Sequence, residues 1–324
     1  APHDIYKLGI GHANSSDFPK WRALVHHEKQ QALEGMRHWR EVSSNSIPKL
    51  KTELPEYVFP GIDANAGIFA IAFAGFDSND ARFHNQLALL DWFQNPVGWN
   101  QSGYTIVNGV PKLALFAFQA LWGALALSRQ KPEFAYKLAM TPLADHRGDS
   151  DSRPLFKCYW AMGWPESMDE DCTVAWTFLN FLIEKWEWLW KLFGTKDDTQ
   201  AAIVAYYSFL NTLDFVSAVK ALRTSDQMRE PIVPLCFWFS SDEVRRQSAH
   251  LLSGIAPFLI DLFSENEIPM TELPELWNQW MHQSTKWVAG AYRQSMSRMH
   301  AGYGIPHYDL PKMIRPESHK RVID

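Results

Sequence analysis

The sequence has few cysteines, no concentrated positive charge and none of the common nucleotide-binding or hydrolase motifs. Its cysteines, Cys158, Cys172 and Cys236, form no CxxC pair, which predicts reduced core thiols in a soluble, cytoplasmic protein. The net charge is −5 and no Lys/Arg run occurs, so we expect no nucleic-acid partner. GxGxxG, GxxxxGKS/T, GxSxG and HExxH are absent, and we predict no cofactor.

Very long apolar runs are also missing from the sequence. The longest, LALFAFQALWGALAL at 113–127, has 15 residues and includes Gln119 and Gly123. A membrane-spanning helix needs about 20 predominantly apolar residues. We therefore predict a central buried helix here, and no membrane span.

Aromatic residues are abundant, at 14% of the chain with 15 Trp. Together with 46% hydrophobic residues, they predict one large core. Helical spacing is clearest where Trp21, Val25, Ala32, Met36 and Trp39 share one face. We expect helices at about 18–45, 63–75, 79–95, 111–138 (in two pieces), 171–193, 197–223, 228–239, 241–263 and 272–301.

The predicted fold is therefore all-α, a multi-helix array of solenoid-like or bundle-like form. Residues 1–17 and the proline-containing segment before 63 read as irregular, and GYTIVNG at 103–109 as a short strand. We expect a single helical domain over 1–324, with a possible weak subdivision into 1–140 and 141–324.

Residues 231–260 show a proline-started apolar helix, a polar turn containing Asp242, and then VRRQSAHLL. This order resembles one HEAT-type helical repeat, over roughly a tenth of the chain. The resemblance implies a helical pair in a layered stack, and it implies nothing about a substrate.

The functional prediction is a non-enzymatic helical scaffold that binds a partner protein, in the manner of an immunity or chaperone-like protein. The polar segment ADHRGDSDSR at 144–153 is the predicted contact loop, because charged side chains are dense there and its spacing is not that of a calcium-binding loop. Its candidate residues are Asp145, His146, Arg147, Asp149, Asp151 and Arg153.

The alternative is an all-α, metal-dependent enzyme whose site combines His, Glu and Asp from separate helices. His27, Glu34 and His38 share one face of the helix expected at 18–45, where a solvated polar face competes with a ligand set. A second candidate set, in the C-terminal tail, is His300, His307 and Asp309.

A third hypothesis rests on Arg245 and His250. An Arg and a His separated by four to six residues on one helix resemble the signature of HEPN-type RNases, and the resemblance implies that both side chains act on a phosphate. In the helical-repeat interpretation Arg245 instead lies on the surface between repeats. The sequence favours that interpretation, because Arg/His pairs at this spacing occur about as often as chance predicts.

Overall fold

The protein is described by a computed structural model that covers residues 1–13, 18–43, 53–77, 89–90, 92–93, 109–143, 153–157, 172–225 and 241–280. Its fold is all-α, a multi-helix array, as the sequence predicts. The strands β1 (Pro142–Leu143) and β2 (Arg153–Pro154) make one short antiparallel pair. They lead into the 3-10 turn η2 (Leu155–Lys157).

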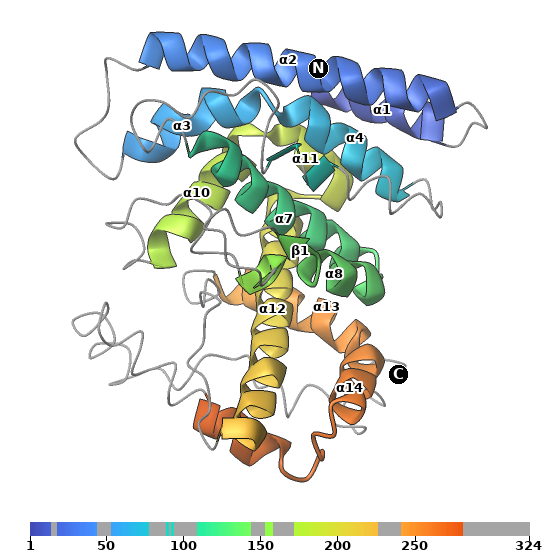
Figure 1. Cartoon of the computed structure of the whole chain (residues 1–324), viewed down its shortest axis with the longest axis vertical. Helices are drawn as coiled ribbons and strands as arrows, with labels where there is room; N and C mark the ends of the chain where they lie inside the picture. Colours follow the sequence, from blue (N-terminus) through green and yellow to red (C-terminus); the bar gives the residue numbers. More distant parts are fainter. Residues whose placement is uncertain are drawn as a thin grey trace.

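The helices form successive layers along the long axis of the molecule (Figure 1). The first layer holds α1 (Pro2–Ala13) and α2 (Phe18–Ser43), and they lie on α3 (Leu54–Asp63) and α4 (Ala66–Asp77). Beneath these lies α7 (Val110–Ser128), with α8 (Pro132–Ala139) against it.

The long helix α12 (Lys196–Ser225) packs on α7 and connects the middle of the molecule to its far end (Figure 1). The helices α10 (Cys172–Lys185) and α11 (Glu187–Phe193) also contact α12. α13 (Asp242–Gly254) packs on α12 and is followed by α14 (Ala256–Glu265), and residues 273–280 are helical again.

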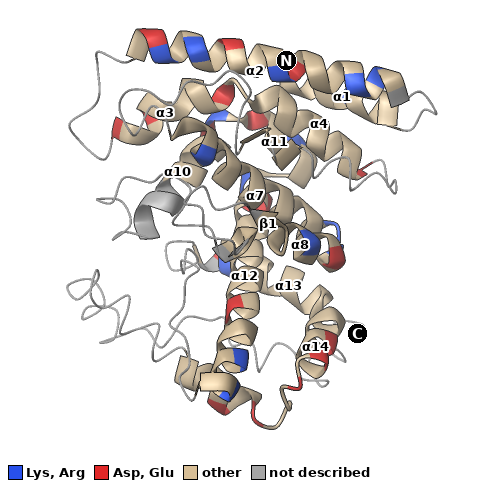
Figure 2. Cartoon of the chain, viewed as in Figure 1, with Lys and Arg blue, Asp and Glu red and all other residues tan. Residues whose placement is uncertain are grey.

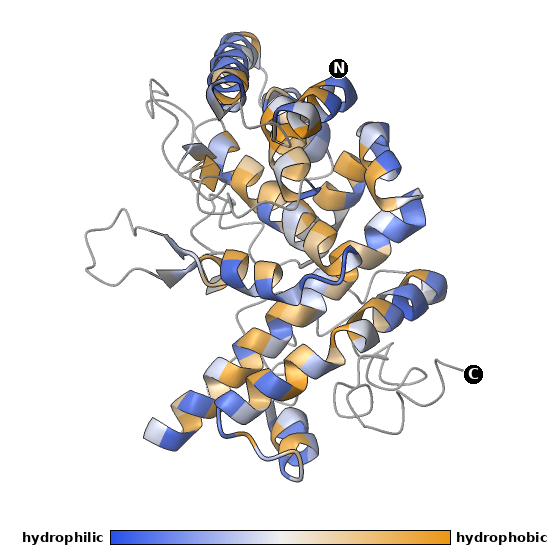
Figure 3. Cartoon of the chain, turned by 90° about the vertical axis from the view of Figure 1, so that its right-hand side faces the viewer, coloured by the Kyte–Doolittle hydropathy of each residue, from blue (hydrophilic) through white to orange (hydrophobic). Residues whose placement is uncertain are grey.

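The middle layers are the most hydrophobic part of the fold. In α4 and α7 almost every residue is buried, and in α12 the same holds between Thr199 and Val219, so these stretches have no polar stripe of the kind seen on α2. At the top of Figure 3, α2 is seen nearly end-on, with hydrophilic residues on its outer side. Aromatic rings tie the layers together: Phe69 of α4 lies edge-to-face on Phe118 of α7 and on Trp186, with centroids 5.1 Å apart in both pairs.

Several predicted elements are confirmed, and others are wrong. The expected helix at 18–45 is α2, and the two pieces at 111–138 are α7 and α8. The predicted helix at 171–193 is broken at Trp186, and the one at 241–263 at Ile255. Residues 1–17 were expected to be irregular but contain α1, and α3 occupies the predicted proline loop.

The predictions of no membrane span and of a cytoplasmic location need correction. Val110–Ser128 and Lys196–Ser225 are each long and apolar enough to cross a membrane, and α3 and α4, bent by 64° at their junction, pass the same test together. The helix that contains the 113–127 run is several residues longer than the run itself. In 196–225, polar residues are interspersed among the apolar ones, so the sequence shows no long apolar run there. In both helices 94% of the apolar window is buried within the chain.

The HEAT-type detail is not confirmed. Residues 231–240 lie outside the described part of the chain, and only the second helix of that pair, α13, is seen. The strand expected at 103–109 also lies almost entirely outside the described residues. The single domain and its possible subdivision stay predictions.

Candidate functional site: the outer face of α2

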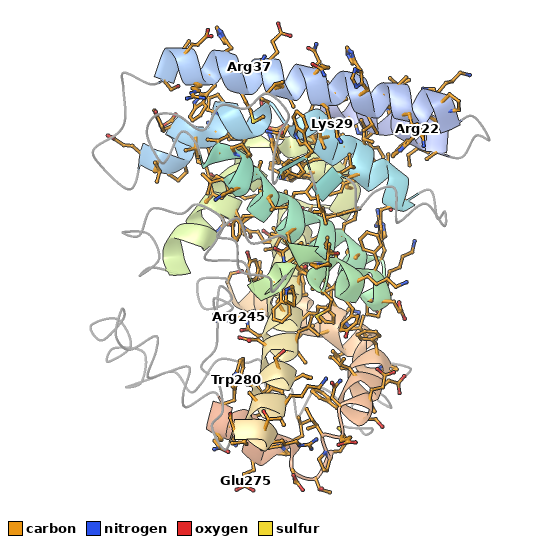
Figure 4. The ribbon with its side chains drawn as sticks, viewed as in Figure 1. Arg22, Lys29, Arg37, Arg245, Glu275 and Trp280 are labelled. Carbon is orange, nitrogen blue, oxygen red and sulfur yellow. The ribbon has the colours of Figure 1, made fainter. Side chains whose placement is uncertain are left out.

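The outer face of α2 is a long row of exposed polar side chains. The helix has 26 residues and is therefore about 39 Å long. Charged residues of both signs are spread along it (Figure 2), and Arg22, Lys29 and Arg37 mark its course in Figure 4. The exposed polar side chains are those of Lys20, Arg22, His26, His27, Gln30, Gln31, Glu34, Arg37, His38 and Glu41.

The inner face of α2 is fixed by large side chains. Trp21, Met36 and Trp39 are buried there. The Trp39 indole Nε1 donates a hydrogen bond to the Tyr57 carbonyl of α3 at 2.9 Å, and the two rings meet edge-to-face at 5.6 Å. The Tyr57 hydroxyl in turn donates to the carbonyl of Ser43, at the end of α2. These contacts fix the position of the helix on α3.

Glycines let α2 approach its neighbours closely. A Cβ placed on Gly35 would lie 2.8 Å from the Ala64 Cβ, and one on Gly61 would lie 2.9 Å from the Trp39 ring. Neither position has room for a larger side chain unless the helices separate. The helix is therefore seated on the α3–α4 junction by contacts that tolerate little displacement.

One carboxylate of α2 points inward, toward the first turn of α4. A Cβ placed on Gly67 would lie only 2.0 Å from the Glu28 Oε2 atom, and the Glu28 side chain is 11% exposed. Burial raises the pKa of Glu28, and the neighbouring His27, with Nε2 4.0 Å from Oε1, opposes that rise. A carboxylate at this place faces the positive end of the α4 dipole.

The α3–α4 junction beneath Glu28 is itself polar and buried. Asn65 is fully buried, donates from Nδ2 to the Gly61 carbonyl at 3.1 Å and accepts from Trp92 Nε1 at 3.2 Å. Trp186 Nε1 donates to Asp63 Oδ1 at 2.6 Å, which connects the α10–α11 break to the end of α3. The bend between α3 and α4 is thus fixed by side chains from two other segments.

A second polar cluster joins α1, α4 and the end of α7. The Tyr6 hydroxyl donates to Asp77 Oδ2 at 2.6 Å, and the Arg129 Nε lies 3.4 Å from Asp77 Oδ1. Burial, followed by the hydrogen bond to Asp77, raises the pKa of Tyr6. Arg129 also donates to the Leu192 carbonyl of α11. This cluster connects four helices, which is a structural role.

The residues predicted as metal ligands on α2 do not converge on a site. His27, Glu34 and His38 are all exposed on the outer face. Within the described ranges, no group of three or more His, Cys, Asp or Glu side chains is placed to hold a metal ion. The side chains exposed on this face are charged or able to form hydrogen bonds.

The predicted nuclease pair lies on α13. His250 is exposed, and Arg245 is half-buried and labelled in Figure 4. Five helical positions turn the chain by about 500°, so the two side chains leave the helix about 140° apart. The spacing is the one that the resemblance to HEPN-type RNases rests on, and the nuclease interpretation stays a prediction.

The other predicted residues lie mostly outside the described residues. Asp145, His146, Arg147, Asp149 and Asp151 fall there, and so do His300, His307 and Asp309. Arg153 begins β2, and its backbone pairs with Leu143. The loop and the tail set stay predictions.

The comparison with known proteins adds no relative. No protein-family model matches the chain, and no curated protein or solved structure is significantly similar to it.

Sequence reasoning missed Glu28, although a signal was present. Trp21, Val25, Glu28 and Ala32 follow one another at helical spacing, so a carboxylate stands within the apolar stripe of α2. An ionisable residue at such a position is expected to have a buried partner. Here that partner is the beginning of α4.

Proposed function

We propose that the protein is a non-enzymatic helical scaffold that binds a partner protein through the outer face of α2. The observation that carries the proposal is the contrast between the two sides of this helix. Its inner side is fixed by Trp21, Trp39 and close glycine contacts, whereas its outer side presents a row of exposed polar groups. A rigid row of this kind binds a partner with little loss of conformational entropy.

The charge of α2 suggests what the partner presents. The helix contains five Lys or Arg, three Glu and three His, whereas the whole chain has a net charge of −5. An acidic protein surface complements this locally basic helix, and charge complementarity speeds association and selects partners. The exposed His27, Glu34 and His38 become contact residues in this proposal.

The experiment is a native pull-down with charge-reversal variants. The tagged chain is recovered, in mild detergent, from cells that naturally produce it, as wild type and as Arg22→Glu/Arg37→Glu. The matched control is Arg246→Glu on α13, whose guanidinium is exposed and pairs with Glu243. We expect one partner in near-equal amount with the wild type and the control, and its loss from the α2 variant. Recovery of no partner, or equal recovery with the α2 variant, would contradict the proposal.

A further inference from the structure

We propose that α7 and α12 enter a lipid bilayer together, as a preformed pair, after the polar helices α2 and α13 separate from the layers that they cover. This activity goes beyond partner binding and takes a lipid bilayer as its ligand. It accounts for two facts that otherwise stand apart: the pair has the length and composition of membrane spans, and the fold buries it.

The burial of α12 is unusual for a helix of a globular core. From Thr199 to Val219 every side chain is buried except Gln200 and Ser217, which are half-buried. These residues cover about 32 Å of helix, close to the thickness of the bilayer's hydrocarbon core. Charged residues lie at both ends, with Lys196, Asp197 and Asp198 before the stretch and Lys220 and Arg223 after it. A typical core helix buries one stripe, whereas α12 is buried all round over about six turns.

Polar side chains within α12 bond to their own helix. Ser208, Thr212 and Ser217 each donate to the carbonyl four residues earlier, and the Asn211 amide donates to the Tyr207 carbonyl. Such bonds do not depend on water, so they persist in hydrocarbon. Asp214 is the one Asp, Glu, Lys, Arg or His between 199 and 219.

α7 meets the same requirements and packs tightly on α12. Between Leu113 and Leu127 every residue is buried and none is charged. A Cβ placed on Gly123 would lie 2.2 Å from the Tyr206 ring, so the ring rests directly on the α7 backbone. Close approach at small residues is how helices associate inside membranes, where no hydrophobic effect drives them together. The contact can therefore survive transfer of the pair into lipid.

Two polar helices cover different parts of this apolar stack. α2 lies over α3 and α4, which contact α7 and pass the membrane test as a bent pair. α13 covers α12, with Glu243, Arg246 and His250 exposed. In a bilayer these charged covers would have to remain at the surface, since each charge at the membrane centre costs several kcal/mol. Insertion therefore requires that covers and apolar helices separate.

The test is photolabelling from inside the bilayer. The wild-type chain is mixed, at neutral and at mildly acidic pH, with vesicles of phosphatidylcholine and phosphatidylglycerol whose acyl chains carry a diazirine near their ends. Labelled positions are mapped by mass spectrometry. We expect labels within 110–128 and 199–219, and none on the outer face of α2. Labels absent from both helices at both pH values, with the chain bound to the vesicle surface or free, would overturn the proposal.

A disulfide tests whether α2 has to move. Gly35→Cys/Ala64→Cys, in a chain whose native cysteines are replaced by serine, ties α2 to the α3–α4 junction. A Cβ on Gly35 would lie 2.8 Å from the Ala64 Cβ, and a disulfide needs about 3.8 Å, so a small shift suffices. The oxidised form should show several-fold less label in α7 and α12 than the same variant after reduction. Equal labelling of both forms would contradict the release of α2. The wild-type experiment decides the matter if this variant does not fold.

Discussion

Gly123 and Tyr206 show how single residues determine the separation of the two central helices. The Tyr206 ring occupies the space in which any other residue at 123 would place its Cβ. Tyr206 is among the largest side chains that the fold buries completely, and it lies on Gly123, which has no side chain. The separation of α7 and α12 thus depends on this pairing of large with small.

Gly123→Ala is expected to destabilise the protein. The added methyl overlaps the Tyr206 ring, so the helices must move apart, and overpacking of this kind costs about 1–3 kcal/mol of unfolding free energy. Chemical denaturation followed by far-UV circular dichroism measures the change. The control is Gly11→Ala in α1, where an added Cβ meets nothing within 4 Å. That substitution should stabilise the protein by about 0.5–1 kcal/mol. A stabilised Gly123→Ala variant would show that the helices are not in contact here.

Glu28 should make stability depend on pH in an unusual direction. Burial raises its pKa above the ordinary value of 4.5, so the folded chain holds this proton more tightly than the unfolded chain does. The contribution of Glu28 is therefore present below the ordinary pKa and is lost as the pH rises through the folded pKa. Glu28→Gln, which keeps the shape without the charge, should gain stability relative to the wild type as the pH rises from about 4.5 to neutral.

Denaturation midpoints measured across that pH range check the prediction for Glu28. Glu34→Gln is the matched control, because Glu34 lies on the exposed face of the same helix, and its difference from the wild type should stay nearly constant. If the midpoint of Glu28→Gln falls relative to the wild type as the pH rises, then the interaction of the charged carboxylate with α4 outweighs its burial.

Elements differ in how well their sequences predict them. α2 is predicted because its apolar residues repeat with a helical period, and α7 because its apolar run is long. α1 is not predicted, because Gly9 and Gly11 in the sequence indicate a break in any helix there. In the structure Gly9 packs against Ala74, where a Cβ would lie only 2.7 Å from the Ala74 Cβ. A glycine that serves close helix packing cannot be told from a turn glycine without the neighbouring helix.

Proline and tryptophan misled the predictions in a similar way. Pro60 lies inside α3, where the sequence predicts a loop. The helical pattern of the sequence continues through Trp186, but the helix in the structure breaks there. The Trp186 indole instead donates to Asp63, 123 positions away in the sequence. Contacts between distant segments decide both cases, so local pattern is not sufficient. The exposed state of His27, Glu34 and His38, in contrast, follows from their position opposite the apolar stripe.

The beginning of α13 offers a test of one cover helix. The Ser241 hydroxyl accepts a hydrogen bond from the Val244 amide at 3.2 Å and caps the helix. Ser241→Ala should destabilise α13 by about 1 kcal/mol and speed hydrogen exchange in its first turn. Ser253→Ala is the control, because that hydroxyl only donates to the Ala249 carbonyl within the same helix. Unchanged exchange in Ser241→Ala would show that packing on α12 alone holds the N-terminus of α13.

At the scale of the whole molecule, polarity changes layer by layer. The polar helix α2 lies at one end of the molecule, and α13 packs beside α12 (Figure 1). Between and beside them, α4, α7 and the 199–219 stretch of α12 are buried almost completely. Composition predicts the large aromatic core and the all-α class, because both follow from residue counts and helical period. It does not predict that one core helix is buried all round, since this depends on how many neighbours surround it.

The central claim is that a partner protein contacts the outer face of α2, and site-specific photocrosslinking tests it most directly. A photoreactive amino acid replaces Gln30, which is exposed on that face, in the chain produced in its native cells. Glu275, exposed at the far end of the molecule (Figure 4), is the control position. We predict one discrete crosslinked protein from position 30 and none from 275. No crosslink from position 30, or the same product from both positions, would contradict the account.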